Sequence, residues 1–140
     1  MVRWLSRFEP WGATLLRLVL GVAMVYHGYA KVVPAHGLDG EPLSAIEHYS
    51  HYVASLGMPA WLGYVSALTE FVGGGLLVLG LLTRFAALMV AGNMLVAMCS
   101  VSFHRGYAAA EYPVALFAIA AMLVFVGGGA AAADGRFGSR

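Results

Sequence analysis

Charged residues are scarce in this chain. Asp, Glu, Lys and Arg together make up 11% of it, against about 25% in a typical soluble domain. Hydrophobic residues make up 61% of the sequence. A net charge of +1, with no basic stripe, provides little to neutralise phosphates and argues against nucleic-acid binding. The composition therefore indicates an integral membrane protein in contact with lipid.

Cysteine is almost absent as well. The one cysteine, Cys99, excludes an internal disulfide, a CxxC redox pair and a thiolate zinc cage. It lies in an apolar run, where we expect a small packing residue. No flavin, haem or iron–sulfur motif is present either. We therefore expect no intrinsic cofactor, and without one this chain alone could not move electrons beyond a bound quinone.

Long apolar segments dominate what remains. They lie at about residues 14–33, 60–82, 85–103 and 112–133, each near the length of about 20 residues that crosses a bilayer. The tight turn at Thr83 and Arg84 makes the second and third segments antiparallel neighbours. The sequence thus predicts an all-α fold, an antiparallel bundle of four transmembrane helices in a single domain over residues 1–140.

Lys and Arg residues are unevenly divided between the two sides of this predicted bundle. Two lie on one side, Lys31 and Arg105, and six lie on the other, namely Arg3, Arg7, Arg17, Arg84, Arg136 and Arg140. Loops rich in Lys and Arg stay in the cytoplasm. We therefore expect both termini to be cytoplasmic and the protein to span the inner (plasma) membrane.

The longest connection, residues 34–59, contains a further helical pattern. Ser44 followed by Glu47 fits a capping box, and apolar residues then recur at helical spacing at Ile46, Tyr49, Val53 and Leu56. This pattern predicts a short amphipathic helix, Ser44–Leu56, in the first outer loop. It would lie on the outer membrane surface or cap the bundle.

A carboxylate interrupts the second apolar segment. Glu70 lies near its centre, where an ionised side chain costs about 2.5–3.5 kcal/mol and usually needs a partner. His27 and Lys31 are four residues apart and share a face of the first segment. The antiparallel arrangement places Glu70 near the depth of His27, which is compatible with a His27–Glu70 hydrogen bond and with Lys31 reaching the same carboxylate.

Further polar residues lie at similar depth. The full predicted buried polar cluster is His27, Lys31, Glu70, Asn93 and Glu111. Glu111 also fits a second role, at the positive end of the fourth helix dipole. Two interpretations of the cluster stay open: a neutralising pair that fixes helix register, or a pocket that holds a quinone head group or relays protons.

Two other groups of polar residues stand out. Arg17, Arg84 and Asp134 lie at the cytoplasmic level of the predicted bundle, where two interpretations stay open: an ion pair, or simple anchoring, which we favour. His48 and His51 are three residues apart on the short helix, a usable spacing for metal ligands. No cysteine or carboxylate completes a recognisable metal signature beside them, so we expect no metal site.

Three motifs in the chain resemble the DoxX family of small membrane proteins. The first is HG-x-x-K at His27, Gly28 and Lys31, and the last is EY…G-x-G…D, from Glu111 to Asp134. The middle motif joins E-x-x-GG to a G-L-x-T-R turn, at Glu70, Gly73, Gly74, Gly80, Leu81, Thr83 and Arg84. The resemblance covers nearly the whole chain, with Ala-Ala-Asp in place of the usual small-Leu-Asp ending.

The resemblance implies a four-helix integral membrane protein. Members of the family are linked with thiosulfate:quinone oxidoreductase subunits and with oxidative-stress complexes. We therefore expect a membrane subunit of a redox assembly, able to form homo-oligomers, that anchors partner subunits and is not catalytic alone. One alternative is a purely structural subunit of a larger respiratory or photosynthetic complex. Small-solute transport ranks last, because the chain shows no inverted repeat and no broken helix.

Overall fold

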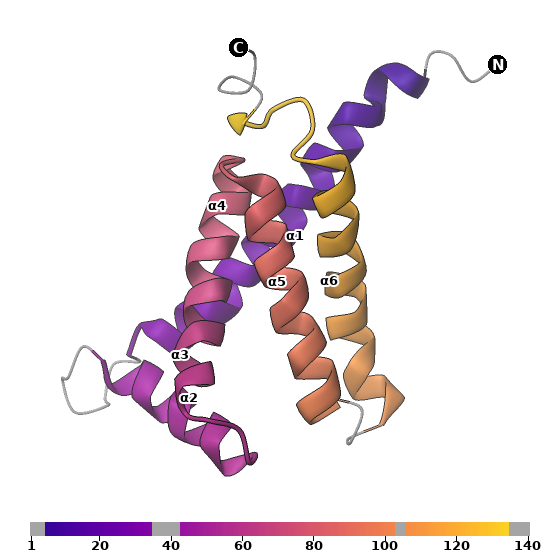
Figure 1. Cartoon of the computed structure of the whole chain (residues 1–140). Coiled ribbons are helices and arrows are strands. Elements are labelled where there is room, and N and C mark those ends of the chain that lie inside the picture. The colour runs from indigo at the N-terminus through magenta and orange to yellow at the C-terminus, as the bar shows by residue number, and fades with distance from the viewer. Residues whose placement is uncertain (1–4, 35–42, 103–105, 135–140) are drawn as a thin grey trace.

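The computed structural model describes residues 5–34, 43–102 and 106–134. In this part of the chain four helical stretches are long and apolar enough to cross a membrane, namely Glu9–Val32, Trp61–Leu79, Thr83–Ser100 and Tyr107–Val126. They run alternately up and down, so both termini lie at one end (Figure 1). The predicted four-span, all-α fold is confirmed. We call the end that holds Glu9 and Val126 the termini end, and the opposite end the α2 end.

The helix bounds differ from those that the apolar runs predict. Helix α1 (Glu9–Val32) begins before residue 14 because Pro10 is well suited to its first turn. Helix α6 (Tyr107–Val126) ends before residue 133 because Gly127 adopts φ 85° and stops it. Hydropathy marks where the chain is apolar, whereas proline and glycine decide where these helices begin and end.

The second span is not a uniform α-helix. It consists of α3 (Trp61–Leu68), a π-helical turn η2 (Thr69–Gly73) and α4 (Gly74–Leu79). The third span is α5 (Thr83–Ala97), which continues into a second π-helical turn, η3 (Met98–Ser102). A 3₁₀ turn, η1 (Leu5–Phe8), precedes α1. Glu70 lies in η2. Because π turns in helices are frequent at functional sites, its surroundings are the first place to look for a functional site.

The middle of the bundle is an apolar layer. Helix α1 packs along α4 and η2 and also contacts α6, while α5 packs along α6. The side chains that fill the space between them have no exposed surface, namely Leu20, Met24, Leu77, Val90 and Leu123. This layer separates the polar groups at the two ends of the molecule.

Glycine allows α1 to approach the second span closely. A Cβ atom on Gly28 would collide with the backbone of Phe71, and one on Gly74 would lie 2.7 Å from the backbone nitrogen of Val25. Small residues permit this backbone contact between membrane helices. The contact brings the α2 end of α1 within side-chain reach of η2.

Helix α2 (Ser44–Ser55) packs against α3 and α1 at the end opposite the termini (Figure 1). The Ser50 hydroxyl donates a 2.8 Å hydrogen bond to the carbonyl of Ala60. The helix buries Ala45, Ile46, Ser50 and Val53. Its N-cap residue is Leu43, so Ser44 is the first residue of the helix and lies one position after the cap position that the predicted capping box assigns to it. The short helix predicted between the first two spans is confirmed, and it caps the bundle.

One predicted packing residue is outside the core. Cys99 in η3 is exposed, so the expected packing role is wrong. The third span turns it away from the other helices.

Several of the basic residues used to predict the membrane orientation lie outside the described residues, namely Arg3, Arg105, Arg136 and Arg140.

Candidate functional site

An ion pair between α1 and η2 is the centre of the candidate site. Lys31 Nζ lies 2.6 Å from Glu70 Oε2 and 2.7 Å from Oε1. Glu70 is 4% exposed, whereas the Lys31 side chain keeps 22% of its surface. A buried carboxylate with a bidentate cationic partner avoids the cost of an isolated charge in lipid. The structure therefore brings together Lys31 and Glu70 as the helix depths predict.

Asn93 adds a third helix to this site. From α5 its Nδ2 donates a 3.0 Å hydrogen bond to Glu70 Oε1. Because an ionised carboxylate can only accept hydrogen bonds, the amide nitrogen of Asn93 must face Glu70. The other N–H and the Oδ1 atom of Asn93 stay available to a neighbouring group.

Two hydroxyl groups extend the site toward α2. Lys31 Nζ donates to the Tyr49 hydroxyl at 3.3 Å and lies 4.3 Å from the centroid of the Tyr49 ring. The Tyr49 hydroxyl lies 3.2 Å from Ser66 Oγ. The sequence pattern predicted Tyr49 only as part of an apolar stripe and gave no role to Ser66. The one available signal was that Ser66 lies four residues before Glu70, on the same helix face.

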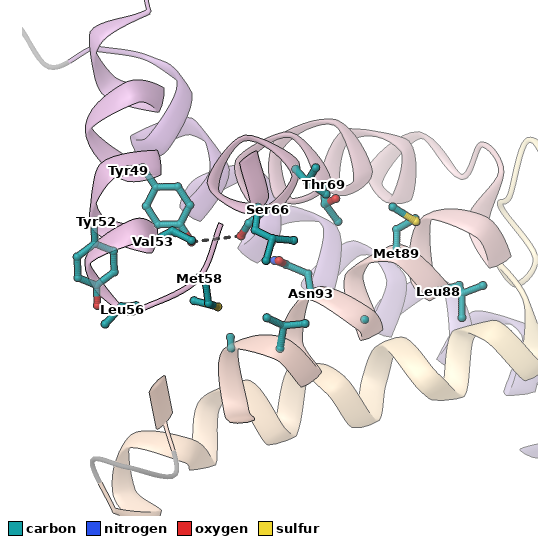
Figure 2. A pocket seen from close by; sticks show the side chains of 15 residues that line it. Tyr49, Tyr52, Val53, Leu56, Met58, Ser66, Thr69, Leu88, Met89 and Asn93 are labelled. Atoms are coloured by element: carbon teal, nitrogen blue, oxygen red, sulfur yellow. Dashed lines mark hydrogen bonds between the residues drawn. The ribbon is translucent and has the colours of Figure 1, made fainter. Parts of the chain in front are cut away.

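A cavity of about 270 Å³ lies between α2, α3 and α5. Tyr49, Ser66 and Asn93 border it, and Figure 2 shows the Tyr49 hydroxyl directed at Ser66 with Asn93 close by. The other walls are mainly apolar and include Leu62, Val65, Leu88, Met89 and Val96. Val65 and Leu88 are 43% and 57% exposed, so the cavity opens on the lateral, apolar surface of the bundle.

His27 does not join the cluster. Its ring stacks on Tyr112 of α6, with the centroids 5.5 Å apart, and its buried Nδ1 atom has no hydrogen-bond partner in the described residues. The predicted His27–Glu70 hydrogen bond is therefore wrong. Gly28 is the residue that faces η2, and the preceding residue of an α-helix points about 100° away from it.

Glu111 is also separate from the cluster. It is exposed and lies beyond the first turn of α6, whose N-cap is Gly106. Its predicted membership of the buried cluster is wrong, and so is the helix-capping role, because the dipole effect is confined to the first turn. Helix α6 begins five residues earlier than the sequence pattern indicated, which moves Glu111 into its interior.

Arg17 and Arg84 bind backbone groups at the termini end. Arg17 is 2% exposed and donates to the carbonyls of Gly128 at 3.0 Å and Ala131 at 3.4 Å. Arg84 donates to the carbonyl of Phe125 at 3.3 Å. Neither forms a salt bridge with Asp134, which the structure also describes. The predicted ion pair is wrong, because the turn after α6 supplies carbonyls closer than the carboxylate.

Asp134 holds the turn between α4 and α5. Its two carboxylate oxygens accept hydrogen bonds from the backbone N–H groups of Leu82 at 2.6 Å and Thr83 at 2.7 Å. Burial acts to raise the pKa of Asp134, but the hydrogen bonds from Thr83 and Leu82 and the charge of Arg17 together lower that pKa below its ordinary value. We call Arg17, Asp134 and the segment 127–134 the C-terminal clasp.

His48 and His51 lie on α2 and are exposed. Within the residues that the structure describes, no group of three or more His, Cys, Asp or Glu side chains is placed to hold a metal ion. The two histidines therefore have no third ligand of these types in that part of the chain.

Comparisons with known proteins agree with the motifs. The family model described as DoxX matches residues 12–105, a range that includes Lys31, Glu70 and Asn93. The chain is 30% identical over 90 residues to "Putative oxidoreductase CatD" of Bacillus subtilis (strain 168), an alignment that covers 64% of this chain and 59% of that protein. No solved structure matches significantly. This multi-pass membrane protein, matched over more than half of its length, belongs to the DoxX family.

Proposed function

We propose that this protein binds the head group of a lipophilic quinone or quinol in the cavity between α2, α3 and α5, as the membrane subunit of a redox assembly. The observation that carries the proposal is a cavity with apolar walls and one polar end, open to the lipid-facing surface. Sites for lipophilic ligands are mostly apolar, with a few polar groups that fix orientation. A quinone has the matching chemistry, a flat ring with carbonyl oxygens on an apolar tail.

The hydrogen bonds support a carbonyl ligand. Lys31 donates to the Tyr49 oxygen, which leaves the Tyr49 hydrogen for Ser66 Oγ, 3.2 Å away. The Ser66 hydrogen is then free to point into the cavity. Because the first N–H of Asn93 is used by Glu70, its second N–H is a further donor. The polar end thus offers donors, as the oxygens of a quinone require.

The apolar walls support a ligand that arrives through the membrane. Leu88 and Met89 of α5 and Val65 of α3 border the cavity and are at least 40% exposed. A tail can leave between these helices without crossing a polar surface. Met89 adds an unbranched, adaptable side chain to this wall.

The proposed role as a subunit follows from what the quinone needs. A quinone exchanges electrons, and this chain carries no motif for an electron carrier, so a partner protein supplies or accepts them. The similarity to a protein named as an oxidoreductase supports a redox context.

The excess of Lys and Arg at the termini end supports both termini being in the cytoplasm and a location in the inner membrane.

A cavity-filling variant tests the proposal. Gly92 lines the cavity, and an added Cβ there has no neighbour within 4 Å, so Gly92→Leu should fill the space without disturbing helix packing. We expect purified protein in mild detergent to bind ubiquinone-1, and Gly92→Leu to weaken this binding at least about tenfold (about 1.4 kcal/mol). Binding is measured by equilibrium titration, with thermal stability recorded in parallel.

The matched control is Gly75→Leu. Gly75 is a membrane-helix glycine with equally open surroundings, but it lies on α4 and does not line the cavity. Its substitution should leave quinone affinity unchanged. Equal affinity of the two variants, or absence of binding by the unsubstituted protein, would contradict the proposal.

One observation favours a second candidate, a purely structural accessory subunit. The Lys31–Glu70 pair is mutually neutral and joins α1 to the second span, as a register-fixing pair would. On this view the Ser66→Ala variant should leave any ligand-dependent property unchanged. Under the quinone proposal it should weaken ubiquinone-1 binding, while Ser55→Ala, which removes an exposed hydroxyl of α2 outside the cavity, should not.

A further inference from the structure

We propose that water and protons reach the polar end of the cavity only from the α2 end. Protons taken up when a bound quinone is reduced, one for each electron, would then come from that side of the membrane. The electrons would come from a flavin-type donor in the partner protein. The proton part of this inference rests on the proposed function, whereas the one-sided access of water does not require any ligand.

The first observation is a continuous polar path at the α2 end. Lys31 lies one residue from the end of α1, and its side chain keeps 22% of its surface exposed. From Lys31 Nζ the path continues to the Tyr49 hydroxyl at 3.3 Å and from there to Ser66 Oγ at 3.2 Å, at the cavity. A hydroxyl can accept one hydrogen bond while donating another, so each step can pass a proton onward.

The second observation is the apolar layer on the other side of the cluster. Arg17 and Lys31 are about 21 Å apart along α1, at a rise of about 1.5 Å per residue. The side chains without exposed surface at intermediate positions on α1 are apolar, Leu20 and Met24, as is Leu77 on α4. His27, whose Nδ1 is buried, lies about one turn from Lys31, between Met24 and the α2 end. Among the described residues, buried polar side chains beyond this layer are those around the clasp, Thr14, Arg17 and Thr83. No polar chain of described residues connects the two ends.

The third observation is that the clasp covers the termini end. The backbone N–H of Ala130 donates to the carbonyl of Pro10 at 3.0 Å, and that of Asp134 donates to the carbonyl of Gly80 at 3.1 Å. The segment after α6 therefore lies across the ends of α1 and α4 (Figure 1). With Arg17 bonded to Gly128 beneath it, this end is closed by backbone and not open to the core.

Cysteine labelling from each side of the membrane tests the inference. The background is Cys99→Ser, and the probe is Ser66→Cys, which places a thiol of similar size at the cavity. Ala54→Cys on α2 and Ala131→Cys in the clasp, both at exposed positions, report the two sides. Ala67→Cys, at a position with no exposed surface, reports background reactivity. A charged, membrane-impermeant methanethiosulfonate is applied to right-side-out and to inverted vesicles, without added quinone.

We expect the Ser66→Cys thiol to react from the side that labels Ala54→Cys, at least tenfold faster than the Ala67→Cys thiol. Reaction from the side that labels Ala131→Cys, or no reaction from either side, would overturn the inference. The proposed function is tested apart from this, because added ubiquinone-1 should slow the Ser66→Cys reaction. Labelling without such protection would contradict the quinone site and leave the one-sided access standing.

Discussion

The cations toward the two ends of helix α1 are held in opposite ways. Lys31, at the α2 end, is bonded to the side chains of Glu70 and Tyr49. Arg17, at the termini end, is bonded to the backbone carbonyls of Gly128 and Ala131. One cation therefore meets an opposite charge on another helix, and the other meets the dipoles of a turn.

This difference distinguishes the candidate binding site at the α2 end from the C-terminal clasp at the termini end. Around Lys31 the side chains satisfy each other and still leave the Ser66 hydroxyl and part of the Asn93 amide facing a cavity. Around Arg17 and Asp134 the charged groups are used to fix the backbone of two turns. Spare hydrogen-bonding capacity beside an open space is a feature of binding sites, whereas charges bonded to turn backbone stabilise the fold.

The largest expected effect comes from breaking the ion pair. Lys31→Met leaves Glu70 buried without its cation, and loss of one partner of a buried pair typically costs about 3–5 kcal/mol. Glu70→Gln should be destabilising for the same reason. The double variant Lys31→Met/Glu70→Gln should recover part of the loss, because neither charge remains. Thermal or denaturant unfolding in detergent gives the free energies for this double-mutant cycle.

The clasp provides the contrasting cycle. Because Arg17 and Asp134 bind different backbone groups and form no salt bridge with each other, the Arg17→Met and Asp134→Asn effects should show a smaller coupling than the Lys31–Glu70 pair. If the effects of Lys31→Met and Glu70→Gln on the free energy of unfolding were strictly additive, the two residues would not interact energetically. A larger coupling in the clasp would reverse the comparison between the two ends.

The fold and the ion pair could be predicted because they depend on long-range averages. Apolar run length sets the number of spans, and antiparallel connection sets the depth at which residues face each other. Both are insensitive to an error of a few residues in the helix bounds. Depth placed Glu70 near His27, with Lys31 within side-chain reach and Asn93 at a similar level, but it did not decide which of His27 and Lys31 is the partner.

The other contacts of the site and of the clasp depend on structural details that the sequence does not display. The roles of Tyr49 and Ser66 require the docking of α2 on α3, which nothing in the amphipathic stripe specifies. The direction of His27 depends on the close contact of Gly28 with Phe71. The partners of Arg17 and Asp134 are backbone groups of turns, and backbone groups are the same at every position, so charge counting favoured an ion pair instead.

A smaller effect is expected from removing the clasp carboxylate. Asp134→Ala deletes the acceptor of two backbone N–H groups at the start of α5. The group is partly exposed to solvent, so the loss should be about 1 kcal/mol. Asp134→Asn, which keeps one acceptor oxygen without the charge, should lose less than Asp134→Ala. Both are compared with the unsubstituted protein by thermal unfolding at neutral pH.

The pH dependence of this contribution has a definite sign. The pKa of Asp134 is lowered in the folded protein, so its ionised form contributes stability above the ordinary pKa of 3.8, and this contribution is lost as the pH falls through the lowered pKa. The stability difference between the unsubstituted protein and Asp134→Asn should therefore be constant near neutral pH and close in strong acid. A difference that widens on acidification would contradict the assigned hydrogen bonds.

The smallest effect concerns the residue that the clasp holds. Leu82 adopts φ 48°, in the left-handed region, which is unfavourable for a residue with a Cβ atom. Its side chain is 62% exposed, so Leu82→Gly removes the conformational penalty and little packing. We expect a gain of less than about 1 kcal/mol in the free energy of unfolding. The matched control is Leu15→Gly, at a 63% exposed position within α1, where glycine should cost about 1 kcal/mol. A loss of similar size at both positions would show that the clasp does not hold Leu82 in a strained conformation.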